Sequence, residues 1–245
     1  REPVIRRRLH LSGPWHTPPN DPESPKSPVL HLGGRPGSPT PHWWRPADFF
    51  IGLPASERDR VSRMVHRTPD VDFTTVPPES IPGELREQVA AWRDPNFLSN
   101  RAYTVTDPAE IDFNSPEVQA AELPASNGIG TARGLARMYA ALIGEVEDFR
   151  LFNSATLVSA TKEQAHGRDQ VLVAPSRFSS GYMLPAADNP MTGPCSFGHT
   201  GRGGSLGFAD PEHGIAFAYV MNHIISGPDD ARAASLVDAV RMSLT

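Results

Sequence analysis

Three β-type segments in close succession constrain the fold of this chain more than any other feature of its sequence. They read SFGHTG (196–201), SLGFAD (205–210) and GIAFAYVMN (214–222), and a shorter one, GYML (181–184), precedes them. The residues Pro211-Glu-His-Gly214, between the second and third segments, have the composition of a hairpin turn. These segments therefore predict an antiparallel meander.

The third of these segments is apolar on both of its faces. Ile215, Phe217 and Tyr219 would point one way, while Ala216 and Ala218 would point the other. Strands that are covered on both faces have this character. The sequence therefore predicts that this strand is central and buried on both sides.

Helical patterns precede and follow the meander. Thr131 is placed to cap the clearest helix, TARGLARMYAALIG, whose apolar residues share one face: Leu135, Met138, Tyr139 and Leu142. A last helix is expected over 229–244, with a buried stripe of Ala233, Leu236, Val237, Val240 and Leu244. Further helices are expected at 56–65, 84–92 and 154–164, a strand end at 48–54, and mostly loop at 95–130. Helices on either side of an antiparallel sheet indicate the α+β class.

The composition of the chain changes at about residue 46. Eleven of its 26 prolines lie in residues 1–46, which carry seven basic and three acidic residues, a net charge of +4. The remaining 199 residues carry 16 basic and 25 acidic residues, a net charge of −9. Prolines at this density interrupt helices and strands. We therefore expect residues 1–46 to be disordered or non-native, such as sequence read in a shifted frame, and residues 47–245 to be the folded part.

Composition also excludes several classes of protein. The net charge of −5 argues against nucleic-acid binding. The sequence contains no run of 18 apolar residues, which a membrane-spanning helix would need. The single cysteine, Cys195, rules out a disulfide scaffold, and no paired-histidine motif predicts a metal or another cofactor. Arg6, Arg7 and Arg8 are not followed by the apolar stretch of a signal peptide, so a cytoplasmic location is expected. The sequence does not specify an oligomeric state.

The glycine-rich segment GHTGRGGSLG (198–207) matches two site patterns. It lacks the Gly-Lys of a P-loop, and Leu206 stands where a dinucleotide-binding fingerprint needs its third glycine. Ser205 fits the G-x-S-x-G nucleophile elbow, which requires a helix directly after the serine. His199-Thr200-Gly201 fits the Lys/His-Thr-Gly strand that lines a serine active site. There Gly201, lacking a Cβ, would let a substrate backbone approach closely.

Two long stretches carry a family resemblance. TARGLARMYAAL (131–142) followed by FGHTGRGGSLGFADPEHGIAFAYVMN (197–222) resembles the serine β-lactamase-related family, and more narrowly its branch of esterases, class C β-lactamases and penicillin-binding carboxypeptidases. DFFIGLP (48–54) resembles the same branch. The resemblance spans residues 47–245. It implies an antiparallel sheet flanked by helices, here incomplete at the N-terminus.

The family's site has three elements, and the resemblance transfers one of them. His199 and Thr200 would contact a substrate carboxylate or carbonyl, and the backbone N–H of Arg202, after Gly201, would donate to the oxyanion. One such donor contributes on the order of 10²–10³ in rate. The other elements are a Ser-x-x-Lys nucleophile and a tyrosine or serine proton relay. Neither is recognisable upstream of DFFIGLP, where the family carries them.

The sequence offers three further catalytic candidates, none convincing. Ser159-Ala-Thr-Lys162 is the only Ser-x-x-Lys in the chain, but it follows the helix at 131–143, whereas the family's motif precedes that helix. Ser205 lacks the helix that an elbow requires. None of the four tyrosines begins a Tyr-x-Asn motif.

The sequence therefore predicts the C-terminal part of a β-lactamase-like serine hydrolase for a small-molecule ester or amide. By itself it should be inactive, because acyl transfer needs an activated nucleophile. An esterase is favoured over a lactamase, since a permanently charged lysine would hold a β-lactam carboxylate better than a histidine at position 199. Two alternatives stay open: a binding protein without activity, and an α/β-hydrolase-type esterase that uses Ser205.

Overall fold

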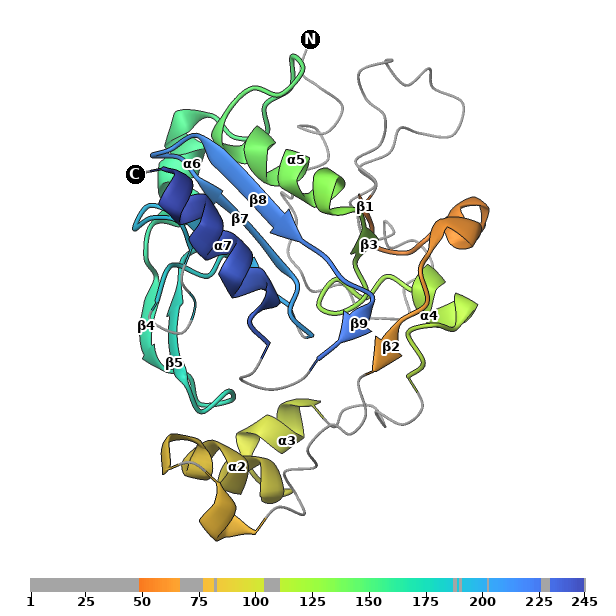
Figure 1. The fold of residues 1–245 in the computed structure, drawn as a ribbon, viewed down its shortest axis with the longest axis vertical. Helices are drawn as coiled ribbons and strands as arrows, with labels where there is room; N and C mark the ends of the chain where they lie inside the picture. Colours follow the sequence, from red (N-terminus) through yellow and green to blue (C-terminus); the bar gives the residue numbers. More distant parts are fainter. Residues whose placement is uncertain are drawn as a thin grey trace, which may run out of the picture.

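The computed structural model of this chain describes residues 49–66, 77–81, 83–103, 111–186, 189, 191–201, 203–225 and 230–244. Residues 1–46, and Arg202 within the glycine-rich segment, lie outside the described residues. Figure 1 shows a β-sheet between two long helices, with smaller elements at its lower and right-hand sides.

The predicted meander is a three-stranded antiparallel sheet. Its strands are β6 (Phe197–Thr200), β7 (Leu206–Asp210) and β8 (Ile215–Tyr219), in the order β6-β7-β8. The register pairs Thr200 with Leu206 and Leu206 with Tyr219 at one end of the sheet. Asp210 pairs with Ile215 at the other end, beside the predicted hairpin turn.

The strand at the centre is not the one that the sequence indicated. β7 is central and buried at every position, whereas β8 is half-buried and lies at the edge of the described sheet. The prediction that β8 is covered on both faces holds, because helices pack on each side. Ala216 packs against the cluster on the α5 side and Phe217 against the cluster on the α7 side, so both faces of β8 are apolar although no described strand pairs with its outer edge.

Helix α5 (Ala132–Ile143) covers one face of the sheet, and helix α7 (Arg232–Ser243) covers the other (Figure 1). On the α5 side, Tyr139 and Leu142 pack in a core cluster with Phe197 and Ala209. On the α7 side, the buried core residues are Met191, Leu206, Phe208 and Val237. The two clusters alternate along β7, as the two-residue period of a strand requires.

Gly207 sets how closely α5 approaches the sheet. A Cβ at this position would lie 2.6 Å from Tyr139 Cε2 and 3.0 Å from Leu135 Cδ2. Real Cβ atoms do not approach neighbours this closely, so only glycine fits beneath the helix. Thr131 caps α5 as predicted, because its Oγ1 accepts a hydrogen bond from the backbone N–H of Gly134 at 3.1 Å.

The other helices depart from the predictions in detail. α2 (Arg86–Arg93) matches the helix expected at 84–92. α6 (Ser154–Thr161) begins within the expected segment 154–164 but is capped one residue earlier, because Asn153 rather than Ser154 is its N-cap, and it ends at Thr161. The stripe predicted on α7 is partly wrong: Val237 is fully buried, but Leu236 is 46% exposed and Leu244 is 37% exposed. The face of α7 that meets the sheet is narrower than the apolar stripe in its sequence.

Several short elements occur where none was predicted. Residues 95–130 contain α3 (Leu98–Tyr103), α4 (Pro116–Ala120) and β3 (Ile129–Gly130), and β3 pairs with β1 (Phe49–Phe50). The helix predicted at 56–65 is wrong, because residues Ala55–Arg60 form a 3-10 helix and Val65–His66 form strand β2. β2 pairs in parallel with β9 (His223–Ile224), a long-range partner that overrides local propensity.

A hairpin of β4 (Ala165–Arg168) and β5 (Pro175–Phe178) was also missed. Every residue of β4 is exposed, so its sequence carries no apolar alternation. The strand predicted at 181–184 is reduced to bridges of Met183 with Phe178 and Gly198, which connect this hairpin to β6. Within the described ranges, no helix is long and apolar enough to cross a lipid bilayer.

Candidate functional site

The end of β6 carries the residues that were predicted to bind substrate. His199, Thr200 and Gly201 are all exposed there, where β6 enters the turn toward β7. The register pairs His199 with Gly207, on the α5 face of the sheet, and Thr200 with Leu206, on the α7 face. The strand end therefore offers a substrate two diverging side chains and the backbone between them.

The His199 ring is held by its own strand. Its Nδ1 lies 2.5 Å from the backbone oxygen of Thr200, and its ring centroid lies 6.0 Å from that of Phe178. Because a carbonyl oxygen only accepts, this contact assigns the proton to Nδ1. In the neutral ring, Nε2 is then a hydrogen-bond acceptor, and in the protonated ring it is a donor. Both states suit contact with a polar substrate group.

Gly201 takes part in the turn that follows it, through contacts with Ser205. Its N–H donates to the backbone oxygen of Ser205 at 2.7 Å, and a Cβ at Gly201 would lie 2.0 Å from Ser205 Oγ. The structure thus gives Gly201 a reason to be glycine beyond the predicted approach of a substrate. Arg202, whose N–H is the predicted oxyanion donor, lies outside the described residues, so that role stays a prediction.

Ser205 does not occupy a nucleophile elbow. It follows a turn in which Gly203 and Gly204 have φ of 83° and 102°, and the chain after it is strand β7. An elbow needs a helix at that point. The alternative of an α/β-hydrolase that uses Ser205 is therefore wrong.

Ser159 and Lys162 lie on a separate element from the strand end. Ser159 is exposed on α6, and Lys162 follows the last residue of that helix as its C-cap. Helix α6 packs through Leu157 against the core cluster on the α5 side. The structure therefore places this Ser-x-x-Lys on the surface of a covering helix.

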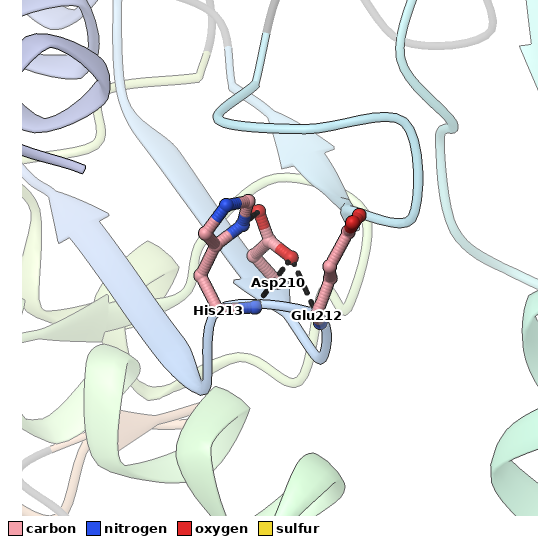
Figure 2. Close-up of side chains that lie close together, drawn as sticks. All are labelled: Asp210, Glu212 and His213. Atoms are coloured by element: carbon pink, nitrogen blue, oxygen red, sulfur yellow. Dashed lines mark hydrogen bonds and ion pairs between the residues drawn. The ribbon is translucent and has the colours of Figure 1, made fainter. Parts of the chain in front are cut away.

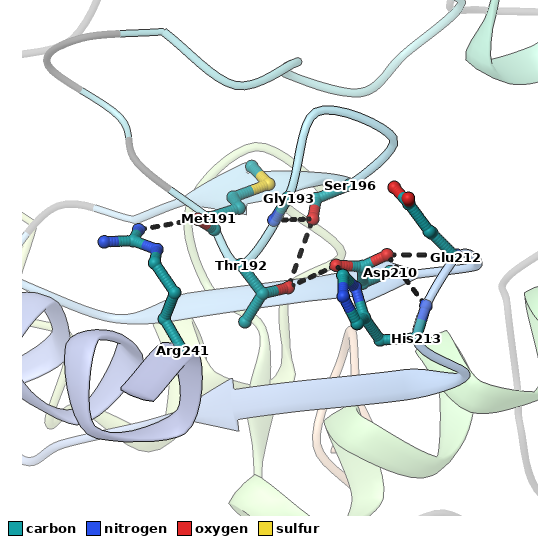
Figure 3. A network of polar contacts seen from close by, with 8 residues as sticks. All are labelled: Met191, Thr192, Gly193, Ser196, Asp210, Glu212, His213 and Arg241. Carbon is teal, nitrogen blue, oxygen red and sulfur yellow. Dashed lines mark hydrogen bonds and ion pairs between the residues drawn. The ribbon is translucent and has the colours of Figure 1, made fainter. Parts of the chain in front are cut away.

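A polar network that the sequence did not reveal lies at the opposite end of β7 (Figure 3). The Asp210 side chain is fully buried, and its Oδ2 accepts hydrogen bonds from Thr192 Oγ1 at 2.6 Å and from His213 Nδ1 at 3.0 Å. Its Oδ1 accepts from the backbone N–H groups of Glu212 and His213. Burial raises the pKa of Asp210, but these hydrogen bonds outweigh it, so the pKa lies below its ordinary value.

The same residues form the one group of possible metal ligands in the described part of the chain. Ligand atoms of Asp210, Glu212 and His213 lie within 4.8 Å of one another (Figure 2). The Asp210 carboxylate already accepts four hydrogen bonds, which tie the β7–β8 hairpin turn to the segment at Thr192. We therefore interpret this group as stabilising the hairpin turn rather than as a metal site. An Asp-Pro pair that opens a turn was the signal available in the sequence.

Comparison with known proteins places this geometry in a family. The profile of the Beta-lactamase family matches residues 41–241, which is most of the chain.

The chain belongs to the beta-lactamase family.

Relatives within this family include esterases. The chain is 42% identical over 121 residues to the "Esterase/beta-lactamase LipL" of Mycobacterium tuberculosis (strain ATCC 25618 / H37Rv), a match that covers 48% of this chain and 27% of LipL. Among solved structures, EstA from Arthrobacter nitroguajacolicus Rue61a has a TM-score of 0.63 and 30% identity, covering 80% of this chain and 49% of EstA.

Two further solved structures give similar values. A family VIII carboxylesterase has a TM-score of 0.59 and 29% identity, covering 78% of this chain and 46% of its own. A penicillin-binding protein homologue from Caulobacter crescentus has a TM-score of 0.59 and 31% identity, covering 80% and 48%. The chain spans about half the length of the solved structures that it matches. The predicted family and fold class are confirmed by these matches.

Proposed function

We propose that residues 47–245 form the substrate-binding half of a serine hydrolase that cleaves carboxylic esters. The observation that carries the proposal is the exposed end of β6, with His199, Thr200 and Gly201 at the border of a sheet that packs between two helices. This end lies inside the stretch that matches the Beta-lactamase family. The nucleophile would come from outside residues 47–245.

The chemistry of His199 favours an ester over a β-lactam. Its Nδ1 contact with the Thr200 carbonyl presents Nε2 of a neutral ring as an acceptor. A hydroxyl group, such as that of the alcohol released from an ester, can donate a hydrogen bond to this nitrogen, whereas a carboxylate requires the protonated ring. The name of the family VIII carboxylesterase points the same way, whereas LipL is named as both an esterase and a β-lactamase.

Among the described residues of this stretch, neither candidate serine hydrogen-bonds to a base. Acyl transfer needs a serine beside a base. Ser159 is exposed on α6. Ser205 lies directly before β7, where its side chain packs against Gly201 of the β6–β7 turn. The family resemblance places the Ser-x-x-Lys upstream of DFFIGLP. We therefore expect the chain to bind esters and not to turn them over.

Hydrolysis of p-nitrophenyl butyrate tests the proposal in two steps. The purified chain should hydrolyse the ester at the rate of buffer alone. Turnover that disappears in Ser159→Ala or in Ser205→Ala would overturn the proposal. The second step uses a chimera in which the part of EstA that precedes the matched stretch replaces residues 1–46.

The chimera should hydrolyse the ester, and His199→Ala should slow it about tenfold, because a hydrogen bond contributes roughly 1–1.5 kcal/mol. Ser159→Ala is the matched control and should leave the rate unchanged. A folded chimera in which His199→Ala has no effect would contradict the role of the β6 end.

A second candidate is a carboxylate-binding protein without any catalytic partner. The exposed end of β6 supports it, because Thr200 and the protonated ring of His199 can each donate a hydrogen bond to a carboxylate. Titration with butyrate, followed by NMR of the His199 ring protons, would show saturable shifts for either candidate. Activity of the chimera distinguishes the two.

A further inference from the structure

Arg232 joins three segments at the end of the sheet where the candidate site lies. It is the first residue of α7, and its Nε and Nη2 each donate to the Asp230 carboxylate at 2.7 Å. Its Nη2 also donates to the backbone oxygen of Gly203, and its Nη1 to that of His223, both at 2.9 Å. The guanidinium carbon lies 5.9 Å from the centroid of the Tyr219 ring. One side chain therefore ties the β6–β7 turn to β8, β9 and α7.

The β6–β7 turn rests directly on this ion pair. A Cβ at Gly204 would lie 2.2 Å from Asp230 Oδ2, and a Cβ at Gly203 would lie 3.0 Å from Ile224 and Met221. The Asp230 side chain is 7% exposed, and its hydrogen bonds from Arg232 hold its pKa below the ordinary value. The turn therefore packs against the Arg232–Asp230 ion pair, whose carboxylate is largely shielded from solvent.

Among the described residues of the turn, two backbone hydrogen bonds hold it. The Gly201 N–H donates to the Ser205 oxygen at 2.7 Å, and the Gly204 N–H donates to the Gly201 oxygen at 3.2 Å. Glycines lose more conformational freedom on ordering than other residues. The planar guanidinium supplies donors in fixed directions, which a lysine ammonium does not.

We propose that Arg232, with Asp230, is a positioning residue that holds Gly203 and Gly204 of the β6–β7 turn, and through them the His199–Gly201 strand end, in the form that binds substrate. The part about substrate rests on the proposed function. The part about the turn does not, because it concerns the backbone of the chain itself.

Amide hydrogen exchange of the full chain, read by NMR, tests the proposal without requiring turnover. In Arg232→Ala, exchange at the amides of Gly201 and Gly204 should rise at least about tenfold. Exchange at Phe208 and Phe217, in the β7–β8 ladder, should rise by less than about threefold. Arg241→Ala is the matched control on the same helix, since Arg241 pairs with Asp238 and donates to the Met191 carbonyl. It should leave Gly201 and Gly204 unchanged.

Rescue separates positioning from general stabilisation. Methylguanidinium at about 50 mM should restore much of the lost protection in Arg232→Ala and have no such effect in Arg241→Ala. Should Arg232→Ala fail to fold, Arg232→Lys and Asp230→Asn carry the test, and both should raise exchange at Gly201 and Gly204 selectively. A uniform rise across the sheet, or unchanged exchange at Gly201, would overturn the proposal. An inactive chimera would count against the hydrolase proposal and leave this result standing.

Discussion

Gly207→Ala should destabilise the protein through the contact between α5 and the sheet. The added methyl carbon would lie 2.6 Å from Tyr139 Cε2 and 3.0 Å from Leu135 Cδ2. Tyr139 is 5% exposed, so its ring has little room to move away. Overpacking of this kind costs about 1–3 kcal/mol, whereas the lower entropy of the unfolded alanine chain offsets about 0.4–1 kcal/mol. We expect a net loss of about 1–2 kcal/mol in the free energy of unfolding.

Urea denaturation followed by circular dichroism measures this loss. Gly83→Ala is the matched control, because no atom lies within 4 Å of its added Cβ. It should leave the stability unchanged or raise it slightly. In a Tyr139→Ala background, Gly207→Ala should cost less, because the ring that it meets is gone. Equal midpoints for the wild type and Gly207→Ala would refute the packing of α5 directly on β7.

Three further predictions concern the sheet and its far end. Phe208→Ala should cost about 3–5 kcal/mol of unfolding free energy, because the ring is fully buried against Phe217, and the same urea titration measures it. The folded-state pKa of Asp210 lies below its unfolded value, so this carboxylate's contribution to stability is present above about pH 4 and is lost as the pH falls further. Thermal melts from pH 6 to pH 2 should therefore show a shallower acid loss in Asp210→Asn. Desolvation, then Glu212, raises the pKa of Cys195. Iodoacetamide labelling at pH 8 should therefore be faster in Glu212→Gln, and an unchanged rate would contradict the contact.

The elements that were predictable are those whose signal is local. Thr131 caps α5, and the apolar residues of one face follow at helical spacing. All the signals for this helix therefore lie within 14 consecutive residues. The hairpin turn at 211–214 has an equally local signal, because Gly214 takes a positive φ of 65° that favours glycine. β4 gave no signal because its side chains are exposed, and β2 gave none because its partner at His223 is distant in the chain.

The site divides in the same way. His199, Thr200 and Gly201 are contiguous and form a pattern that a sequence can display. The contact that holds the β6–β7 turn joins Arg232 to Asp230 and to the backbone carbonyls of Gly203 and His223, which are distant from Arg232 in the sequence or belong to other elements. Backbone acceptors have no sequence signature, so a contact of this kind is visible only once the chain is folded.

Labelling with a fluorophosphonate, followed by mass spectrometry of the modified peptides, tests the central claim most directly. Such a reagent reacts with serines that a neighbouring base activates. We expect no adduct on any serine of residues 47–245, and an adduct on the EstA-derived part of the chimera. An adduct on Ser159 or Ser205 of the chain would contradict it, because the stretch would then hold a nucleophile of its own.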